Sequence, residues 1–326
     1  MSTASDREIS HIFGIKLGGS VVAPKDGQRT ALPDVCRQVA EAYSKITSRE
    51  YGSGFFIAHG AGYLGHGFMD LLGLKQYGNN IPVGEEEHIY LINRGQQIIA
   101  NEIVSHIREY GIGCEIVTTS ETVSMNKNKT IGDFPYDNVK DIIEDGRIVI
   151  MSPGVVRNGP NHKVVCSGDD VLYRAMTEFS NDYKNVRAIL STNVEGVYND
   201  HPDKCGARRV AKLDRNTIKN VISGIEGSSE DGVDITGAML GKVEKAFSKF
   251  HYHIKNDKIL PGNRLISIVS GRDGHSLKES LVQEYPIYYR DIIGTIISTA
   301  DSNLSNEHWY ANLKDNKSNK FLAYEK

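Results

Sequence analysis

The chain has 326 residues, of which 39% are hydrophobic and 24% are charged, and its formal net charge is −3 at neutral pH. This length suffices for one large domain or two small ones, and the nearly balanced charge provides no polycationic surface of the kind that attracts nucleic acids. No run of about 18 apolar residues occurs, so we expect neither a membrane-spanning helix nor a membrane partner.

The beginning of the chain and its cysteines are typical of a cytoplasmic protein. The first residues, MSTASDREISH, are polar and lack the apolar core of a signal peptide. The cysteines (Cys36, Cys114, Cys166 and Cys205) are widely separated and form no C-x-x-C pair. This spacing fits reduced thiols better than disulfides or a zinc site.

Apolar runs alternate with helical patterns in the first half of the chain. The sequence predicts strands over residues 12–17, 54–58, 114–118 and 148–151, and helices over 34–47, 85–110 and 138–144. The longest helix carries isoleucines at helical spacing between Ile89 and Ile107.

A second half begins near Pro160 and continues the alternation. We predict strands over residues 164–166, 187–191, 265–269 and 294–299, and helices that end near residue 179 and cover 236–251 and 276–281. Residues 301–326 are polar and lysine-rich and are predicted to form a peripheral extension.

This order of elements predicts an α/β fold, a three-layer αβα sandwich with a mostly parallel central sheet. Ligands of such sheets bind at the carboxyl ends of the strands. The polar segments that follow predicted strands are therefore the candidate functional residues.

The stretch from Gly54 to His66, GFFIAHGAGYLGH, reads as a strand, a glycine-rich turn and the start of a helix. Such a turn lets backbone amides and the helix dipole approach an anion, which predicts a phosphate-bearing ligand. Its G-x-G-x-x-G pattern also occurs in dinucleotide-binding folds, which require an acidic residue at the end of the next strand. Here Glu85 and its neighbours open a helix instead, which disfavours a nicotinamide cofactor. A tight turn without a ligand is the simpler alternative.

Four more polar segments follow predicted strands or open predicted helices. Each alone also fits an ordinary loop or a capped helix, and neither a Walker A motif nor a protein-kinase signature occurs in the chain. The segments are Lys16–Ser20 with Lys25 beyond it, Ser167–Asp170, Ser191–Tyr198, and Asp234–Met239 followed by Lys242.

Taken in order, the five segments resemble the motifs of the amino acid kinase superfamily. They read KLGGS, HGAGYLGH, SGDD, TNVEGVY and TGAMLGK, and the resemblance spans residues 12–299. HGAGYLGH is similar to the turn of isopentenyl phosphate kinases and the related fosfomycin kinases, whose final histidine contacts the phosphate or phosphonate of the acceptor.

The resemblance implies an ATP- and Mg²⁺-dependent kinase that phosphorylates a phosphorylated acceptor, in the first place isopentenyl phosphate. A phosphonate kinase of the fosfomycin type and a non-catalytic small-molecule-binding regulator on the same fold are the alternatives. It further implies one domain over residues 1–300, with the acceptor over residues 1–160 and ATP over 161–300, and a homodimer formed through helices of the first half.

Residue roles follow from the same resemblance. Lys16 and Lys242 would contact the transferring phosphoryl group and the nucleotide phosphates, Asp170 would orient both lysines, and His66 would donate to the acceptor phosphate. The other nucleotide-binding residues would be Gly18, Gly19, Ser20, Lys25, Asp169, Thr192, Asn193, Gly196, Tyr198, Thr236 and Gly237. The acceptor would be bound by Gly60, Ala61, Gly62, Gly65 and His66, and no side chain is assigned as a resident metal ligand.

Overall fold

The computed structural model describes residues 9–24, 30–48, 52–77, 81–82, 84–183, 185–200, 204–210, 212–213, 239, 241–243, 245–246, 264–283 and 294–297. The predicted site residues Lys25, Thr236 and Gly237 and the C-terminal extension over 301–326 lie outside these ranges. Of the helix predicted over 236–251, the described residues 239, 241–243, 245 and 246 are helical.

The central sheet has eight strands in the order β4-β5-β2-β1-β8-β10-β11-β9. All neighbours in it are parallel except β10 and β11, which confirms the prediction of a mostly parallel sheet. The strands are β1 (Ile9–Leu17), β2 (Gly52–His59), β4 (Cys114–Val117), β5 (Ile148–Met151), β8 (Asn185–Thr192), β9 (Lys212–Leu213), β10 (Arg264–Ser270) and β11 (Thr295–Ile297).

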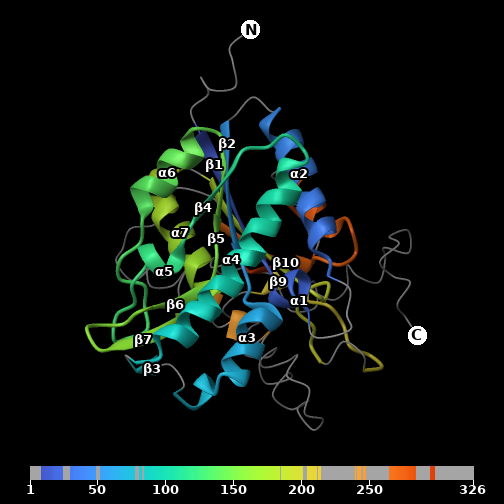
Figure 1. Ribbon diagram of the computed structural model, residues 1–326. Helices are drawn as coiled ribbons and strands as arrows, with labels where there is room; N and C mark the ends of the chain where they lie inside the picture. Colours follow the sequence, from blue (N-terminus) through green and yellow to red (C-terminus); the bar gives the residue numbers. More distant parts are fainter. Residues whose placement is uncertain are drawn as a thin grey trace.

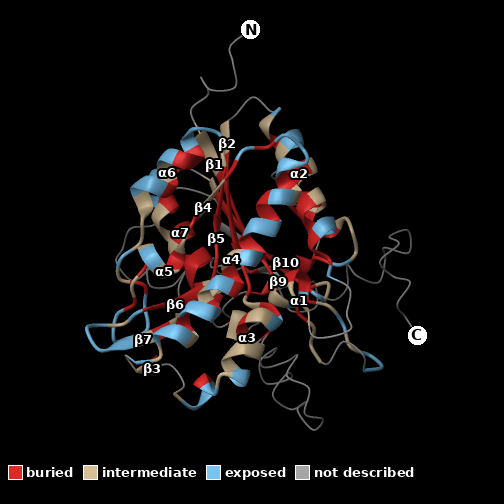
Figure 2. Ribbon diagram, viewed as in Figure 1, coloured by how far each residue is buried: buried red, intermediate tan, exposed pale blue. Residues whose placement is uncertain are grey.

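Helices cover both faces of this sheet, which makes the predicted three layers (Figure 1). One face packs against α6 (Tyr136–Glu144) and α7 (Gly168–Asp182), and the other against α2 (Leu32–Thr47), α4 (Glu86–Arg108) and α10 (Ser276–Val282). The alternation along β2 shows why: Phe56 belongs to the first core and Phe55 to the second, because successive strand side chains point to opposite faces. Figure 2 shows the sheet as the buried centre between the two helical layers.

A second, three-stranded antiparallel sheet lies beside the first, in the order β3-β7-β6. It consists of β3 (Ile81–Pro82), β6 (Gly154–Arg157) and β7 (His162–Cys166). The sequence placed the start of a second half near Pro160, but this residue lies in the turn of the β6–β7 hairpin. Gly159, with φ of 76°, allows the reversal.

The short elements α1 (Gly19–Val22), α3 (Gly62–Leu71), η2 (Leu74–Tyr77) and α5 (Thr119–Thr122) complete the described structure. None of the helices in the described ranges combines the length and the apolar character needed to cross a membrane.

The register of the parallel strands aligns their carboxyl ends. Leu17 of β1 is paired with His59 of β2 and with Ser191 of β8, and Ser191 is paired in turn with Val269 of β10. The predicted functional segments that follow β1, β2 and β8 therefore begin at the same edge of the sheet, although they are far apart in the sequence.

Candidate active site

Lys16 lies one residue before the end of β1, and its side chain faces α7. The face that carries Lys16 also carries Gly14, where a Cβ atom would overlap Met176 of α7. At the start of α7 a Cβ on Gly168 would likewise overlap the carbonyl oxygen of His59. These two glycines allow α7 to lie close to β1 and β2, which brings the first turn of the helix to the Lys16 ammonium.

Asp169 is the carboxylate that meets Lys16. Lys16 Nζ lies 3.1 Å from Asp169 Oδ1, and only 7% and 16% of the two side chains are exposed. Burial alone would raise the pKa of Asp169, but the charges of Lys16 and Lys242, the hydrogen bond from Lys16 and the charge of Lys245 lower it below its usual value. The Asp169 carboxylate is therefore ionised at neutral pH and faces several cations.

Asp170 closes the start of α7 and lies beside Lys245. Its amide donates to Ser167 Oγ (3.2 Å) and its carboxylate accepts from the Ser167 amide (3.3 Å), which forms a capping box at the start of α7. Lys245 Nζ lies 3.4 Å from Asp170 Oδ2. We expected Asp170 to orient Lys16 and Lys242; the ion pair with Lys16 that the structure describes is made by the adjacent Asp169.

Lys242 and Lys245 approach α7 from the described helical residues 241–243, 245 and 246. The Lys242 charge lowers the pKa of Asp169, as the Lys16 charge does. Lys245 was not predicted, although its spacing of three residues from Lys242 places both on one side of a helix. The result is a buried carboxylate within electrostatic reach of Lys16, Lys242 and Lys245.

The two glycine turns at the ends of β1 and β2 pack directly against each other. A Cβ atom on Gly19 would lie 2.6 Å from the Gly62 amide nitrogen, and one on Gly60 would overlap the Gly19 backbone. The Gly60 amide donates to the Leu17 carbonyl at 2.7 Å. We expected that amide to face the acceptor, and this expectation is wrong because Leu17 already accepts from it.

The neighbouring amides of the second turn are differently placed. The Tyr63 amide donates to the Ala23 carbonyl at 2.8 Å, whereas the amides of Ala61 and Gly62 have no hydrogen-bond acceptor among the described residues. Gly62 has φ of 54°, which favours glycine, and no side chain caps the start of α3. Ala61 and Gly62 are thus the backbone donors of this turn.

Gly65 and His66 lie in the first turns of α3. A Cβ on Gly65 would overlap Ala61 and lie 3.1 Å from Gln96 Nε2, so this glycine serves the packing of α3 on α4. Much of the His66 side chain is accessible to solvent. Protein atoms around the ring still remove part of its hydration, and this desolvation, followed by the charges of Lys75 and Lys16, lowers the pKa of His66. Its electrostatic interaction with Lys16 links α3 to the lysine cluster, and His66 is a neutral donor at pH 7 before a ligand binds.

Ser20 follows the first glycine turn and is exposed. Its carbonyl accepts a hydrogen bond of 2.7 Å from the guanidinium of Arg272, which follows β10. Gly18, just before it, fits tightly against β8, since a Cβ there would lie 2.5 Å from the Ser191 carbonyl oxygen. The first turn is therefore contacted both by the end of β8 and by Arg272, which follows β10.

The predicted nucleotide loop follows β8. Thr192 donates to the side chain of the exposed Asn193 (3.2 Å), and a Cβ on Gly196 would lie 2.5 Å from Thr295 Oγ1. Burial, followed by the Glu195 charge, raises the pKa of Tyr198 to about 12. The Val197 amide donates to Thr295 Oγ1 at 2.8 Å, so the final strand β11 fixes this loop.

The sequence matches the amino acid kinase family over residues 15–249, which is more than half of the chain. The chain belongs to the amino acid kinase family. The protein is accordingly a kinase of this family.

Several proteins similar to this kinase are isopentenyl phosphate kinases. The isopentenyl phosphate kinase of Methanothermobacter thermautotrophicus is 25% identical over 260 residues, which cover 76% of this chain and 92% of that protein. Among solved structures, one isopentenyl phosphate kinase aligns with a TM-score of 0.64 at 19% identity, covering 88% of this chain and 100% of that one. The T. acidophilum isopentenyl phosphate kinase product complex aligns at 0.59 with 17% identity and the same coverage.

A more distant neighbour shares the fold with this kinase. N-acetylglutamate synthase from Neisseria gonorrhoeae aligns with a TM-score of 0.55 at 13% identity, covering 91% of this chain and 62% of that one. These alignments show a common amino acid kinase fold, in agreement with the mostly parallel sheet and its two helical layers.

Within the described ranges of the kinase, no group of three or more histidine, cysteine or acidic side chains gathers in a way that could hold a metal ion. Asp169, the buried carboxylate of the site, is already neutralised by lysines. Phosphates that arrive with a nucleotide are the hard oxygen ligands that Mg²⁺ prefers.

Proposed function

We propose that this kinase transfers the terminal phosphoryl group of ATP to the phosphate of a small acceptor, converting isopentenyl phosphate to isopentenyl diphosphate. The observation that supports the proposal is the parallel pairing of β1, which carries Lys16 near its end, with β2, which is followed by the Ala61 and Gly62 amides and His66. The similarity to an isopentenyl phosphate kinase over 76% of the chain supports this acceptor.

In this proposal the chemistry needs no covalent enzyme intermediate. An oxygen of the acceptor phosphate attacks the γ-phosphorus, a new P–O bond forms, and the bond to the β-phosphate oxygen breaks as ADP leaves. The acceptor oxygen is already anionic, so no strong general base is required. Catalysis then consists of positioning and of neutralising the charge on the transferred group.

We assign the cationic part of this task to the lysines. Asp169 holds Lys16 in place, so that the ammonium group faces the transferring phosphoryl group, and Lys242 approaches the same carboxylate from the second half. Mg²⁺ bound to the ATP phosphates would supply further neutralisation of charge. His66 and the amides of Ala61 and Gly62 donate to the acceptor phosphate.

A panel assay tests the proposal. ADP release is measured with isopentenyl phosphate, dimethylallyl phosphate, fosfomycin, glutamate and aspartate, each with and without Mg²⁺. Mg²⁺-dependent turnover with isopentenyl phosphate is the expected result, and the Asp169→Asn variant serves as the matched inactive control. Turnover with fosfomycin alone would favour a phosphonate kinase, and turnover with an amino acid alone would refute the branch assignment.

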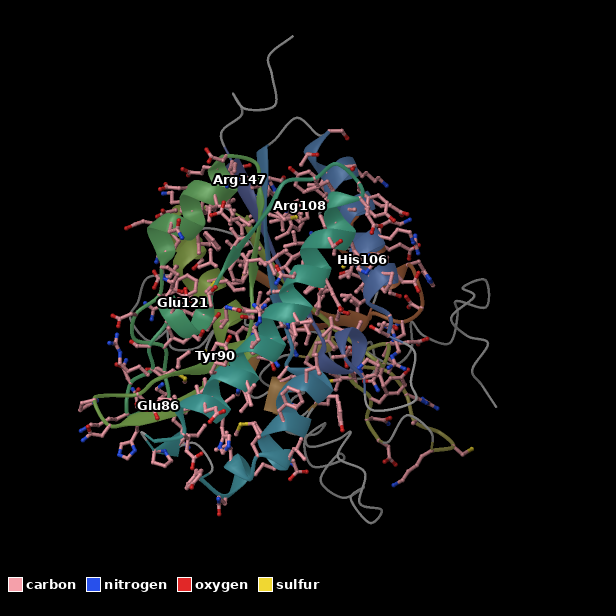
Figure 3. All side chains as sticks on the ribbon, viewed as in Figure 1. Glu86, Tyr90, His106, Arg108, Glu121 and Arg147 are labelled. Carbon is pink, nitrogen blue, oxygen red and sulfur yellow. The ribbon has the colours of Figure 1, made fainter. Side chains whose placement is uncertain are left out.

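We further propose that the kinase is a homodimer that pairs through α4. Tyr90, Leu91 and Ile98 on the outer side of this helix are exposed by 65%, 43% and 46%. Figure 3 shows this helix from Glu86 to Arg108, with Tyr90 near its first turn. Light scattering at micromolar concentration should report a dimer for the wild type and a monomer for a Leu91→Glu, Ile98→Glu variant; a monomeric wild type would refute the proposal.

A further inference from the structure

Two buried polar side chains lie behind the second glycine turn, between it and α4. His59 is 0% exposed and Gln96 is 1% exposed. His59 Nδ1 lies 3.0 Å from the Gly60 carbonyl oxygen, and Gln96 Nε2 donates to the Ala61 carbonyl oxygen at 3.4 Å. Two successive carbonyl groups of the turn are therefore held from one side.

The protonation of His59 follows from its partner. A carbonyl oxygen can only accept, so Nδ1 carries the proton in this hydrogen bond. Burial lowers the pKa of His59 to about 4, with the Lys16 charge acting in the same direction, so the ring is neutral at pH 7. The backbones of Gly60 and Gln96 act in the opposite direction and counter part of this lowering of the pKa. Nε2 is then an acceptor, and it makes no hydrogen bond of normal length and angle to any described residue.

Gln96, like His59, has one polar atom in a hydrogen bond to the turn and one buried acceptor atom that makes no normal hydrogen bond to a described residue. Its Oε1 atom is buried and makes no hydrogen bond to any described residue. An unsatisfied buried acceptor costs about 1–3 kcal/mol, whereas apolar side chains of similar shape would avoid this cost. A pair of such side chains at one turn is therefore better explained by what their donors hold than by stability alone.

The geometry of the peptide plane shows what they hold. In a planar trans peptide the C=O and N–H groups point in opposite directions. Fixing the Gly60 carbonyl toward His59 turns the Ala61 amide away from α4, and fixing the Ala61 carbonyl toward Gln96 turns the Gly62 amide away from α4. These are the same two amides that have no acceptor among the described residues.

We propose that His59 and Gln96 are positioning residues that hold the Gly60–Gly62 turn so that the Ala61 and Gly62 amides face the acceptor phosphate. The inference rests on the proposed function in that it takes the acceptor anion to bind at this turn. His59 and Gln96 do not touch the substrate; they act through the backbone.

Three variants and one matched control test this role. His59→Phe keeps the ring but removes the donor, Gln96→Met keeps the length but removes the amide, and His59→Asn retains a donor near the position of Nδ1. The control is Gln38→Met, because Gln38 is equally buried and its Oε1 accepts from the Leu277 amide at 3.0 Å, in the contact between α2 and α10.

KM values for ATP and for the acceptor are measured separately, together with kcat and the melting temperature. The acceptor used is whichever compound of the panel the wild type phosphorylates. The wild-type protein alone therefore shows whether isopentenyl phosphate is the substrate, and the variants test the positioning role separately. His59→Phe and Gln96→Met should raise the acceptor KM about tenfold or more with the ATP KM within about twofold, and His59→Asn should restore most of the loss. Gln38→Met should lower the melting temperature only. If the acceptor KM values of His59→Phe and Gln96→Met change no more than that of Gln38→Met, the proposal is wrong.

A second readout needs no substrate. Nitrogen-15 chemical shifts of the His59 imidazole at pH 7 should show a neutral ring with the proton on Nδ1. A proton on Nε2, or a charged ring, would contradict the hydrogen bond to Gly60 and with it the proposed role, whatever the panel assay shows.

Discussion

Asp169→Asn and Asp170→Asn each neutralise one of the two neighbouring carboxylates at the start of α7, and the two substitutions should have different effects. Asp169→Asn removes the charge that faces Lys16 at 3.1 Å, where the two side chains are only 16% and 7% exposed. Breaking a buried pair by removing one partner costs about 3–5 kcal/mol, because the other charge stays buried and uncompensated. A misdirected Lys16 should also lower kcat by about 10²-fold or more, which is the scale of losing one preorganised donor.

Asp170→Asn should instead weaken the capping box with Ser167. Loss of a cap costs about 1 kcal/mol, and Ser167 Oγ can still accept from the amide of residue 170. We therefore expect a small loss of stability and a loss in kcat at least tenfold smaller than for Asp169→Asn. Urea unfolding and steady-state kinetics on both variants decide the matter; an Asp170→Asn variant that loses more kcat than Asp169→Asn would refute our reassignment of the Lys16 contact.

Three further predictions concern single side chains. Lys16→Ala and Lys242→Ala should each lower kcat by about 10²-fold or more, since each removes charge stabilisation worth roughly 3 kcal/mol in the transition state; near-normal kcat in either variant would show that its role is wrong. His66→Ala should raise the acceptor KM far more than the ATP KM, and His66→Gln should retain more activity because an amide still donates; equal losses in both KM values would assign His66 to structure. The folded pKa of His59, about 4, lies below the unfolded value near 6.5, so the unfolded chain binds more protons between these pH values. The free energy of unfolding should therefore fall by roughly 3 kcal/mol as the pH drops from 6.5 to 4, and this loss should shrink in His59→Asn; an equal pH dependence in both proteins would contradict the buried neutral ring.

The elements were most predictable where the hydrophobic pattern was strong. The strand predicted over 148–151 is β5 with the same bounds, and the helix predicted over 85–110 is α4, Glu86–Arg108. The β6–β7 hairpin escaped prediction because its two short apolar runs resemble a strand next to a loop, and their pairing depends on the turn at Gly159 and Pro160.

The site was predictable as a set of segments but not contact by contact. Lys16 and the two glycine turns meet as expected, since each follows a strand of the same parallel sheet. The ion pair between Asp169 and Lys16 was not predictable, because either carboxylate of SGDD can face a lysine and the packing of α7 on β1 decides how close each one comes. The use of the Gly60 amide by Leu17 likewise depends on how closely the two turns approach.

The central place of β1 has a consequence for how the chain is synthesised. This strand pairs on one side with β2, residues 52–59, and on the other with β8, residues 185–192. A nascent chain that has reached only Asp182 therefore lacks the partner for one whole side of β1. Unpaired strand edges of this kind recruit other chains, so fragments that end before β8 should aggregate unless a chaperone shields them, and productive folding of the sheet has to wait until about residue 192 has left the ribosome.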